Sequence, residues 1–269
     1  MKIAILAALF LGAYFVTALL LILSLDRLMY YPHRVLDARP SDFGLEAEEV
    51  AFFAADGTPL FGWYFADPAS RAILIFLHGN AGNISHRLGM VPLLLGARAD
   101  VFLFDYRGYG ESGGEPRGEK PLLDARAALE TVRSRPESAG RKIVLFGESI
   151  GGTMSLILAA DEAVDGVVTL GAFSSTRDVA REMPFYRVFT PLVPDRYNAR
   201  EALERMEVPV FFIHGTEDEI IPFSHGKRLL AAAGKEKEHL WIEGGGHNDL
   251  FHVAGMEIVR RLSAFLDRL

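Results

Sequence analysis

The stretch Gly147-Glu148-Ser149-Ile150-Gly151 follows the pattern G-x-S-x-G and lies between two apolar segments. Residues 142–146 before it form a short apolar run typical of a buried strand, and residues 152–160 after it are small and apolar, as in a packed helix. A strand, a sharp turn and a helix are the context that makes such a serine a nucleophile. The flanking glycines favour the turn, because a Cβ atom would clash there. The alternative is a serine that only caps the helix N-terminus.

The segments around this stretch alternate between apolar runs and helical patterns. An antiparallel hairpin is expected over residues 50–65, with its turn at Asp56-Gly57. Expected strands then follow at 72–77, 101–104, 142–146, 167–170, 210–213 and 239–242, and expected helices at 86–95, 119–132, 152–160, 224–233 and 250–266. Continuous apolar strands that alternate with helices predict a mostly parallel, doubly wound sheet covered on both faces. A chain of 269 residues is long enough for one such domain.

The N-terminus contains a long uncharged segment, residues 3–25. As a helix this segment would extend about 34 Å, enough for the hydrocarbon core of a bilayer. We therefore predict a single-pass membrane anchor at 3–25, a connector at 26–46 and a folded domain at 47–269. A signal peptide cleaved after Val16-Thr17-Ala18 remains an alternative. A buried core helix is disfavoured, because the segment is apolar on all sides.

The side of the membrane on which the domain lies is open. Lys2 precedes the apolar segment, whereas Arg27, Arg34 and Arg39 follow it, which slightly favours a cytoplasmic domain. Against this, a short basic tail before an apolar run resembles an export signal.

Composition excludes several classes of function. The net charge is −7 and no run of Lys or Arg occurs, so nucleic-acid binding is not expected. Cysteine is absent, which excludes disulfides, thiolate catalysis and cysteine-ligated metals. The histidines are scattered and the glycine-rich loops match no nucleotide-binding pattern, so neither a metal nor a cofactor is predicted. Protein partners remain open.

A serine hydroxyl needs a base, and the base needs an orienting carboxylate. Asp218 follows the expected strand 210–213 and is the candidate acid; Glu217 and Glu219 are rivals that flank the same turn. His247 is the candidate base, because it follows three glycines after the last expected strand and precedes a helix. The other seven histidines lack this placement or are expected to be structural. The predicted catalytic residues are Ser149, Asp218 and His247.

Two further groups of residues complete the expected site. An oxyanion hole needs two backbone N–H groups, for which we expect Ile150 and Asn80, the latter in the glycine-rich loop after strand 72–77. The interval 173–206 is rich in proline and aromatic residues and is predicted to be a short lid. Its candidate substrate contacts, in an apolar channel near Ser149, are Phe173, Phe185, Tyr186 and Phe189. Alternatively, these aromatic residues only seal the edge of the sheet.

Taken together, the motifs resemble the α/β-hydrolase superfamily, in particular its serine aminopeptidase-like, membrane-anchored branch. The motifs that carry the resemblance, in chain order, are Tyr30-Tyr31-Pro32, residues 78–83, residues 105–112, the stretch around Ser149, residues 214–222 and Gly246-His247. The resemblance covers the chain from about residue 48 to its end. It implies an α/β-hydrolase fold with an N-terminal antiparallel hairpin and a short lid, preceded by one transmembrane helix. It also implies a triad at Ser149, Asp218 and His247, and a mainly structural role for Asp105 and Arg107.

The function expected from these features is a membrane-anchored serine hydrolase. It would cleave carboxylic esters or thioesters of a small-molecule or lipid-like acyl substrate through an acyl-enzyme on Ser149. The same three residues would also support a peptidase or amidase, or an acyltransferase, because a fold does not select the second nucleophile. A non-catalytic binding module is the remaining alternative.

Overall fold

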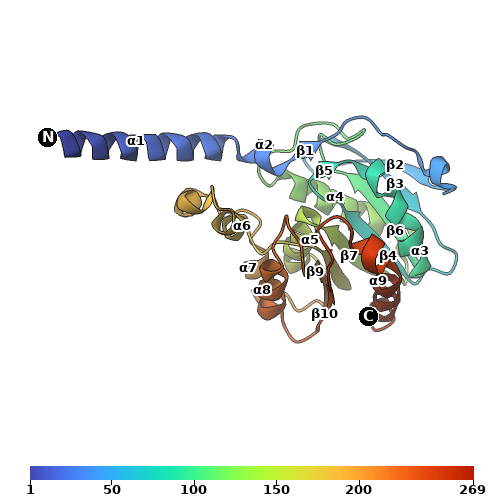
Figure 1. The fold of residues 1–269 in the computed structure, drawn as a ribbon. Helices are drawn as coiled ribbons and strands as arrows, with labels where there is room; N and C mark the ends of the chain where they lie inside the picture. The colour runs from blue at the N-terminus through green and yellow to red at the C-terminus, as the bar shows by residue number, and fades with distance from the viewer.

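The computed structural model describes residues 1–269 and contains an eight-stranded sheet in the order β10-β9-β8-β7-β4-β6-β3-β2 (Figure 1). The strands β2 and β3 form the predicted antiparallel hairpin, β3 runs antiparallel to β6, and the remaining neighbours are parallel. The strands are β2 Glu48–Phe53, β3 Pro59–Phe65, β4 Ala72–Leu77, β6 Ala99–Asp105, β7 Lys142–Glu148, β8 Gly166–Leu170, β9 Val210–Gly215 and β10 Lys237–Ile242. The predicted fold class is thus confirmed.

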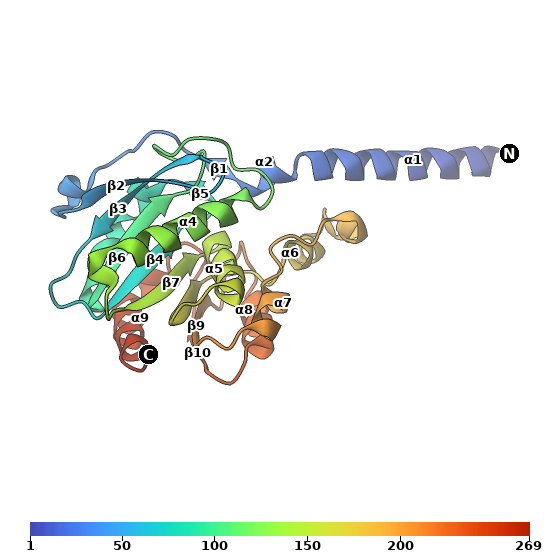
Figure 2. The same cartoon turned by 180° about the vertical axis from the view of Figure 1, so that it is seen from behind.

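Helices cover both faces of this sheet. Figures 1 and 2 show α3 (Val91–Gly96) and α9 (Leu250–Leu266) on one face, and α4 (Lys120–Ser134), α5 (Ile150–Asp161) and α8 (Ser224–Ala232) on the other. Every residue of β4 is buried: Ile73 and Ile75 pack with α4 and α5, whereas Leu74 and Phe76 pack with α3 and α9. A strand buried on both faces explains the continuous apolar runs of the sequence.

One expected helix differs in form. The segment expected as a helix at 86–95 begins as a 3-10 helix, Ile84–Met90, and becomes α-helical only from Val91. Pro92 lies in the first turn of α3, where its missing N–H group needs no partner. The prediction placed a helix correctly here but missed this break.

Between β8 and β9 the chain forms three short helices, of which the first two pack against each other and the third packs against α5 and α8. They are α6 (Thr176–Glu182), η4 (Arg187–Leu192) and α7 (Ala199–Arg205). We call residues 173–206 the lid. The smaller elements are η1 (Pro40–Phe43), η3 (Pro136–Ser138) and the parallel pair β1 (Tyr31–Pro32) and β5 (Ala81–Gly82).

The N-terminal helix α1 (Lys2–Leu23) projects from the domain and is followed by the short α2 (Leu25–Met29) (Figures 1 and 2). Its mean hydropathy is 2.6 over an 18-residue window, and it is long and apolar enough to cross a membrane, a property that signal sequences share. Ala18 is its only buried residue, so α1 is not a core helix of the domain.

Candidate active site

Ser149 lies at the turn between β7 and α5 in a strained backbone conformation, with φ 54° and ψ −119°. Non-glycine residues rarely adopt such angles, and they persist mainly at functional sites. The Ser149 amide donates a 2.8 Å hydrogen bond to the carbonyl of Leu170, which ties the turn to β8. At Gly151 a Cβ atom would lie 2.0 Å from the carbonyl oxygen of Leu77, so only glycine fits. The turn therefore holds the serine at the carboxyl end of a central strand.

The structure brings the three predicted triad residues together. His247 Nε2 lies 3.1 Å from Ser149 Oγ, and His247 Nδ1 lies 2.7 Å from Asp218 Oδ2. Each residue follows the carboxyl end of a different strand, Ser149 after β7, Asp218 after β9 and His247 after β10. Parallel strands bring these ends to one edge of the sheet, which is why residues so far apart in the sequence meet.

The carboxylate of Asp218 is buried and fully hydrogen-bonded. Its Oδ1 accepts from the N–H groups of Ile220 (3.0 Å) and Ile221 (2.7 Å), and Oδ2 lies 3.3 Å from His214 Nε2. Burial alone raises the pKa of Asp218, but the hydrogen bonds from His214 and His247 outweigh burial and hold this pKa below its ordinary value. Asp218 is therefore ionised at neutral pH and can orient the His247 ring.

The two rival carboxylates are not in this position. Glu217 is exposed, and Glu219 accepts a 3.3 Å hydrogen bond from the backbone N–H of His247 rather than contacting the ring. Glu219 thus supports the loop that carries the histidine.

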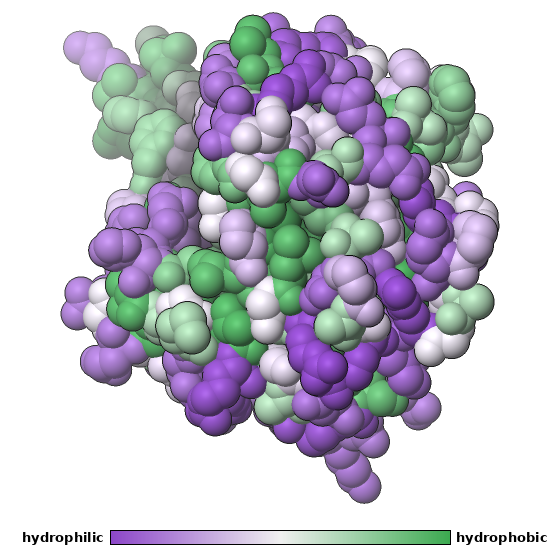
Figure 3. Space-filling view, turned by 90° about the vertical axis from the view of Figure 1, so that its right-hand side faces the viewer, coloured by the Kyte–Doolittle hydropathy of each residue, from purple (hydrophilic) through white to green (hydrophobic).

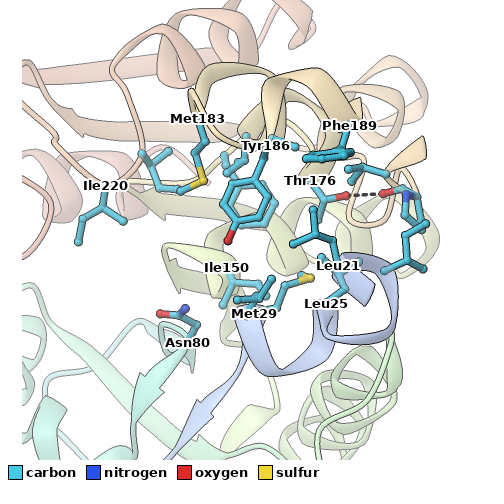
Figure 4. Close-up of a pocket in the computed structure, with 18 of the residues that line it drawn as sticks. Leu21, Leu25, Met29, Asn80, Ile150, Thr176, Met183, Tyr186, Phe189 and Ile220 are labelled. Carbon is cyan, nitrogen blue, oxygen red and sulfur yellow. Dashed lines mark hydrogen bonds between the residues drawn. The ribbon is translucent and has the colours of Figure 1, made fainter. Parts of the chain in front are cut away.

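Hydrogen bonds fix the loop after β4 in a conformation that leaves the backbone N–H of Asn80 free to donate to a ligand. The Asn80 carbonyl accepts from the N–H of Tyr31 (2.9 Å) and from the hydroxyl of Tyr109 (2.7 Å), whereas the Asn80 N–H has no acceptor within the chain. The Ile150 amide is likewise unpaired at the start of α5. Asn80, Ser149 and Ile150 all line the same cavity (Figure 4). This arrangement is compatible with the expected oxyanion hole.

A buried ion pair that the sequence reasoning missed supports this loop. Arg87 Nε lies 2.9 Å from Glu148 Oε2, and Arg87 also donates to the carbonyl of Ala81 (2.7 Å). Glu148 in turn accepts from the Gly79 amide at 3.2 Å. Burial raises the pKa of Glu148, but the charge of Arg87 outweighs burial and lowers it. Glu148 lies inside the G-x-S-x-G stretch. A charged residue just before a buried turn indicates that an oppositely charged partner is needed, and this was the sequence feature that could have predicted the ion pair.

The residues expected to be structural lie beneath the site. His78 is fully buried with its Nε2 3.3 Å from Asp105 Oδ1, and Asp105 accepts a 3.0 Å hydrogen bond from the Ile84 amide. Arg107 is buried against Asp124, with a shortest contact of 2.7 Å, and also pairs with Asp56. These contacts connect the loops after β4 and β6. No group of three or more His, Asp or Glu side chains is placed to hold a metal ion.

Ser149 lines an apolar cavity of about 280 Å³, which Figure 4 shows between the lid and the N-terminal helices. Of the predicted substrate contacts, the structure brings Phe173, Tyr186 and Phe189 into its wall. Phe185 is not brought there: its side chain is 63% exposed on the outside of the lid. Consecutive residues in a helical turn point to different sides, so Phe185 and Tyr186 cannot both face the cavity.

The N-terminal helices form part of the cavity wall, which was not predicted. Figure 4 shows Leu21, Leu25 and Met29 beside the lid. The side chains of α1 and α2 that line the cavity are Ala18, Leu21, Ile22, Leu25, Leu28 and Met29. Their spacing of three or four residues is that of one helix face. In a segment that is apolar throughout, this face could not be distinguished from the others.

Comparisons with known proteins agree with this architecture. The profile of the family described as alpha/beta hydrolase fold matches residues 72–202. The chain is 35% identical over 241 residues to the uncharacterized protein YfhR of Salmonella typhi, covering 82% of this chain and 80% of that one. It is 32% identical to the alpha/beta hydrolase domain-containing protein 17C of Xenopus laevis, covering 82% of this chain and 70% of that one.

Solved structures show the same fold. The esterase Pf2001 of Pyrococcus furiosus superposes with a TM-score of 0.75 over 89% of this chain and 98% of its own, at 21% identity. At this identity the likeness concerns the fold. With the family profile and the relatives above, it supports a hydrolase with an esterase-like architecture, and the chain belongs to the α/β-hydrolase family.

Proposed function

We propose that this protein is a membrane-anchored serine hydrolase that cleaves carboxylic esters or thioesters. In this proposal Ser149 is the nucleophile, His247 the general base and Asp218 the orienting acid. The observation that carries it is the pair of contacts through the imidazole, 3.1 Å from Nε2 to Ser149 Oγ and 2.7 Å from Nδ1 to Asp218 Oδ2. A nucleophile hydrogen-bonded to a base that a third group orients is the arrangement needed for acyl transfer.

The mechanism follows from these positions. His247 Nε2 takes the proton of Ser149 Oγ as that oxygen attacks the substrate carbonyl, and the ionised Asp218 stabilises the imidazolium. The developing oxyanion accepts hydrogen bonds from the Asn80 and Ile150 amides. The imidazolium then returns the proton to the leaving alcohol or thiol. A water molecule activated by His247 hydrolyses the acyl-enzyme and releases the acid.

An active-site probe tests this proposal directly. A fluorophosphonate should label the native protein covalently at Ser149, and peptide mass spectrometry should locate the adduct. Ser149→Ala should not be labelled, and Ser155→Ala, which removes a buried hydroxyl bonded within α5, should be labelled like the native protein. A native protein that resists labelling would support the non-catalytic alternative.

The apolar wall of the cavity favours an acyl chain over a peptide. Of its 22 lining residues 18 are hydrophobic, and such a wall offers a peptide few hydrogen bonds. We expect kcat/KM to rise with acyl length by up to about 0.8 kcal/mol, or about fourfold, for each methylene buried, until the cavity ends. A series of soluble p-nitrophenyl esters beside aminoacyl amides measures this. A flat profile from acetate upward, or faster cleavage of the amides, would favour the peptidase alternative.

The anchor gives a second expectation. The full-length protein should remain with membranes in high salt and in carbonate at high pH, because about 20 apolar residues insert essentially irreversibly. Sedimentation followed by N-terminal mass spectrometry tests this, with a peripheral membrane protein as the control that carbonate releases. A mature chain that begins after Ala18 would instead identify a cleaved signal peptide.

A further inference from the structure

The inner face of α1 packs on the lid. Tyr14 stacks on Phe189 with 5.2 Å between ring centroids, and its hydroxyl donates a 3.0 Å hydrogen bond to the Val188 carbonyl. One and two turns further along, Ala18 is 2% exposed and Leu21 lines the cavity. The C-terminal half of α1 is therefore a wall of the protein as well as part of its anchor.

The outer face of the same turns is bare and apolar. Its side chains are 53–72% exposed and are those of Phe15, Val16, Leu19, Leu20 and Leu23. A contiguous apolar surface of this kind belongs in a protein interface or a bilayer. Because the apolar sequence continues without a charge from residue 3 to residue 25, the bilayer is the surrounding that suits the whole helix.

The length of the helix decides how deep the lid lies. If only the part free of the lid, residues 2–13, were inserted, it would reach about 18 Å, well short of the 30 Å hydrocarbon core. If α1 inserts as far as Leu23, its whole length matches that core. Tyr14 then lies nine residues, or about 14 Å, inside the hydrocarbon boundary. The part of the lid that contacts Tyr14 must be at the same depth.

The surface of lid residues 183–194 suits this position. From Met183 to Pro194 the only charged residue is Arg187. Phe185 and Val188 point outward at 63% and 61% exposure. The methylenes of Arg187 suit the apolar region, and its guanidinium can extend in the direction of the interface. The end of the molecule opposite the helix differs, since hydrophilic residues cover much of it (Figure 3).

The cavity connects this immersed region with the nucleophile. Leu21 and Phe189 line its part between α1 and the lid, and Met29 and Asn80 line its inner part (Figure 4). Ser149 also lines the cavity. Met29 lies beyond the uncharged segment, after Asp26 and Arg27. The inner end is therefore level with the bilayer interface, where the ester groups of lipids lie, while the walls further along are level with the acyl chains.

We infer that residues 183–194 of the lid are immersed in one leaflet and that the cavity receives its acyl chain sideways from the bilayer, between α1 and this segment. The substrate class is then an ester or thioester of a chain that already resides in the membrane. This inference rests on the proposed hydrolase function for the chemistry, but the position of the lid and the path of the chain do not depend on it. An acyl chain that takes this path never crosses water, so no hydrophobic penalty opposes its transfer.

Spin labelling measures the depth of the lid, and the absence of cysteine makes single labels simple to place. Labels at Phe185→Cys and Val188→Cys are compared in full-length protein in phosphatidylcholine vesicles with Leu20→Cys on the outer face of α1. Phe53→Cys, exposed on the hairpin strand β2, is the aqueous control. We expect the lid labels to collide with oxygen and to be shielded from a water-soluble nickel chelate, as at Leu20. Lid labels as accessible to nickel as the label at Phe53 would overturn the inference.

Photo-crosslinking follows the chain without requiring turnover. Ser149→Ala protein is placed in vesicles containing a phosphatidylcholine with a diazirine at the end of one acyl chain, irradiated and mapped by peptide mass spectrometry. Adducts at Phe173 or Ile150 are expected, because these residues line the cavity and are only 6% and 3% exposed. Adducts confined to the outer face of α1 would show that the cavity does not take up bilayer chains, and the inference would be wrong.

Hydrolysis rates for membrane-embedded and soluble esters distinguish a failure of this inference from a failure of the proposed function. Val188→Glu should lower hydrolysis of a long-chain ester embedded in vesicles by about tenfold or more, because a carboxylate opposes immersion of the lid. Hydrolysis of soluble acetate esters should be unchanged, and Phe53→Glu should affect neither substrate. Equal rates for Val188→Glu and native protein on the embedded ester would contradict the inference. If neither substrate is cleaved while labels and adducts are as expected, the proposed function fails and the inference stands.

Discussion

Replacing Ser149 by alanine is expected to lower kcat for a soluble ester by about 10⁴-fold or more while the protein remains folded. The hydroxyl is the only group at this edge of the sheet that is bonded to His247 Nε2, so its loss removes the proposed nucleophile itself. The cavity and the backbone amides of Asn80 and Ile150 remain in this variant. Any residual turnover should therefore come from a site that binds the ester but cannot form an acyl-enzyme. Steady-state kinetics, with circular dichroism to confirm folding, measure this.

Variants of the two residues that would assist Ser149 test the proposed base and the proposed orienting acid. His247→Ala and Asp218→Asn should each cause losses of a similar order, because the first removes the proposed base and the second removes the charge proposed to orient it. His252→Ala is the matched control, since His252 is exposed on α9 five residues from the base. Near-normal activity in His247→Ala would show that another group is the base.

Arg107→Ala is expected to reduce the free energy of unfolding by about 3–5 kcal/mol, because it leaves a buried carboxylate unpaired. Arg107 and Asp124 have side chains that are 2% and 0% exposed, and the guanidinium contacts the carboxylate from both Nε and Nη2. Asp124 also accepts from the Arg107 amide at 2.9 Å, so the pair ties the loop after β6 to α4. Urea unfolding of the detergent-solubilised full chain gives the loss.

Two variants make this result specific. Arg117→Ala removes an exposed arginine that pairs only with Glu115, and its effect should remain within about 0.5 kcal/mol. The double replacement Arg107→Met with Asp124→Leu removes both charges together and should recover much of the stability that Arg107→Ala loses. An Arg107→Ala protein as stable as the native one would contradict a structural role for this motif.

Much of the fold, and which three residues of the candidate site meet, could be predicted for local reasons. The strand, turn and helix around Ser149 are encoded in neighbouring residues: an apolar run, two glycines and a small-residue helix. Once that element is placed, strand order brings the carboxyl ends of β9 and β10 to the same edge. Asp218 and His247 could then be chosen by position alone. In the structure the His247 ring is within hydrogen-bonding distance of both Ser149 and Asp218.

Other features of the site could not be predicted, because they depend on which face of a segment packs against which distant part of the chain. The order of residues 185–189 shows aromatic side chains but not that Phe185 points outward while Tyr186 and Phe189 point into the cavity. The ion pair of Glu148 and Arg87 joins residues 61 positions apart, and no local pattern relates them.

The sequence by itself determined that the chain has an uncharged N-terminal helix, a mostly parallel sheet and a serine at a strained turn, because hydrophobic periodicity and glycine placement act over a few residues. Only the tertiary structure decided that this helix also forms a wall of the cavity. A helix apolar on every side contains no signal for its packing face. That face is selected when Tyr14 packs on Val188 and Phe189 of the lid, about 170 residues later in the chain, and Ala18 is buried. Burial against a distant partner is a property of the folded chain, and it joins the N-terminal helix and the cavity in one structure.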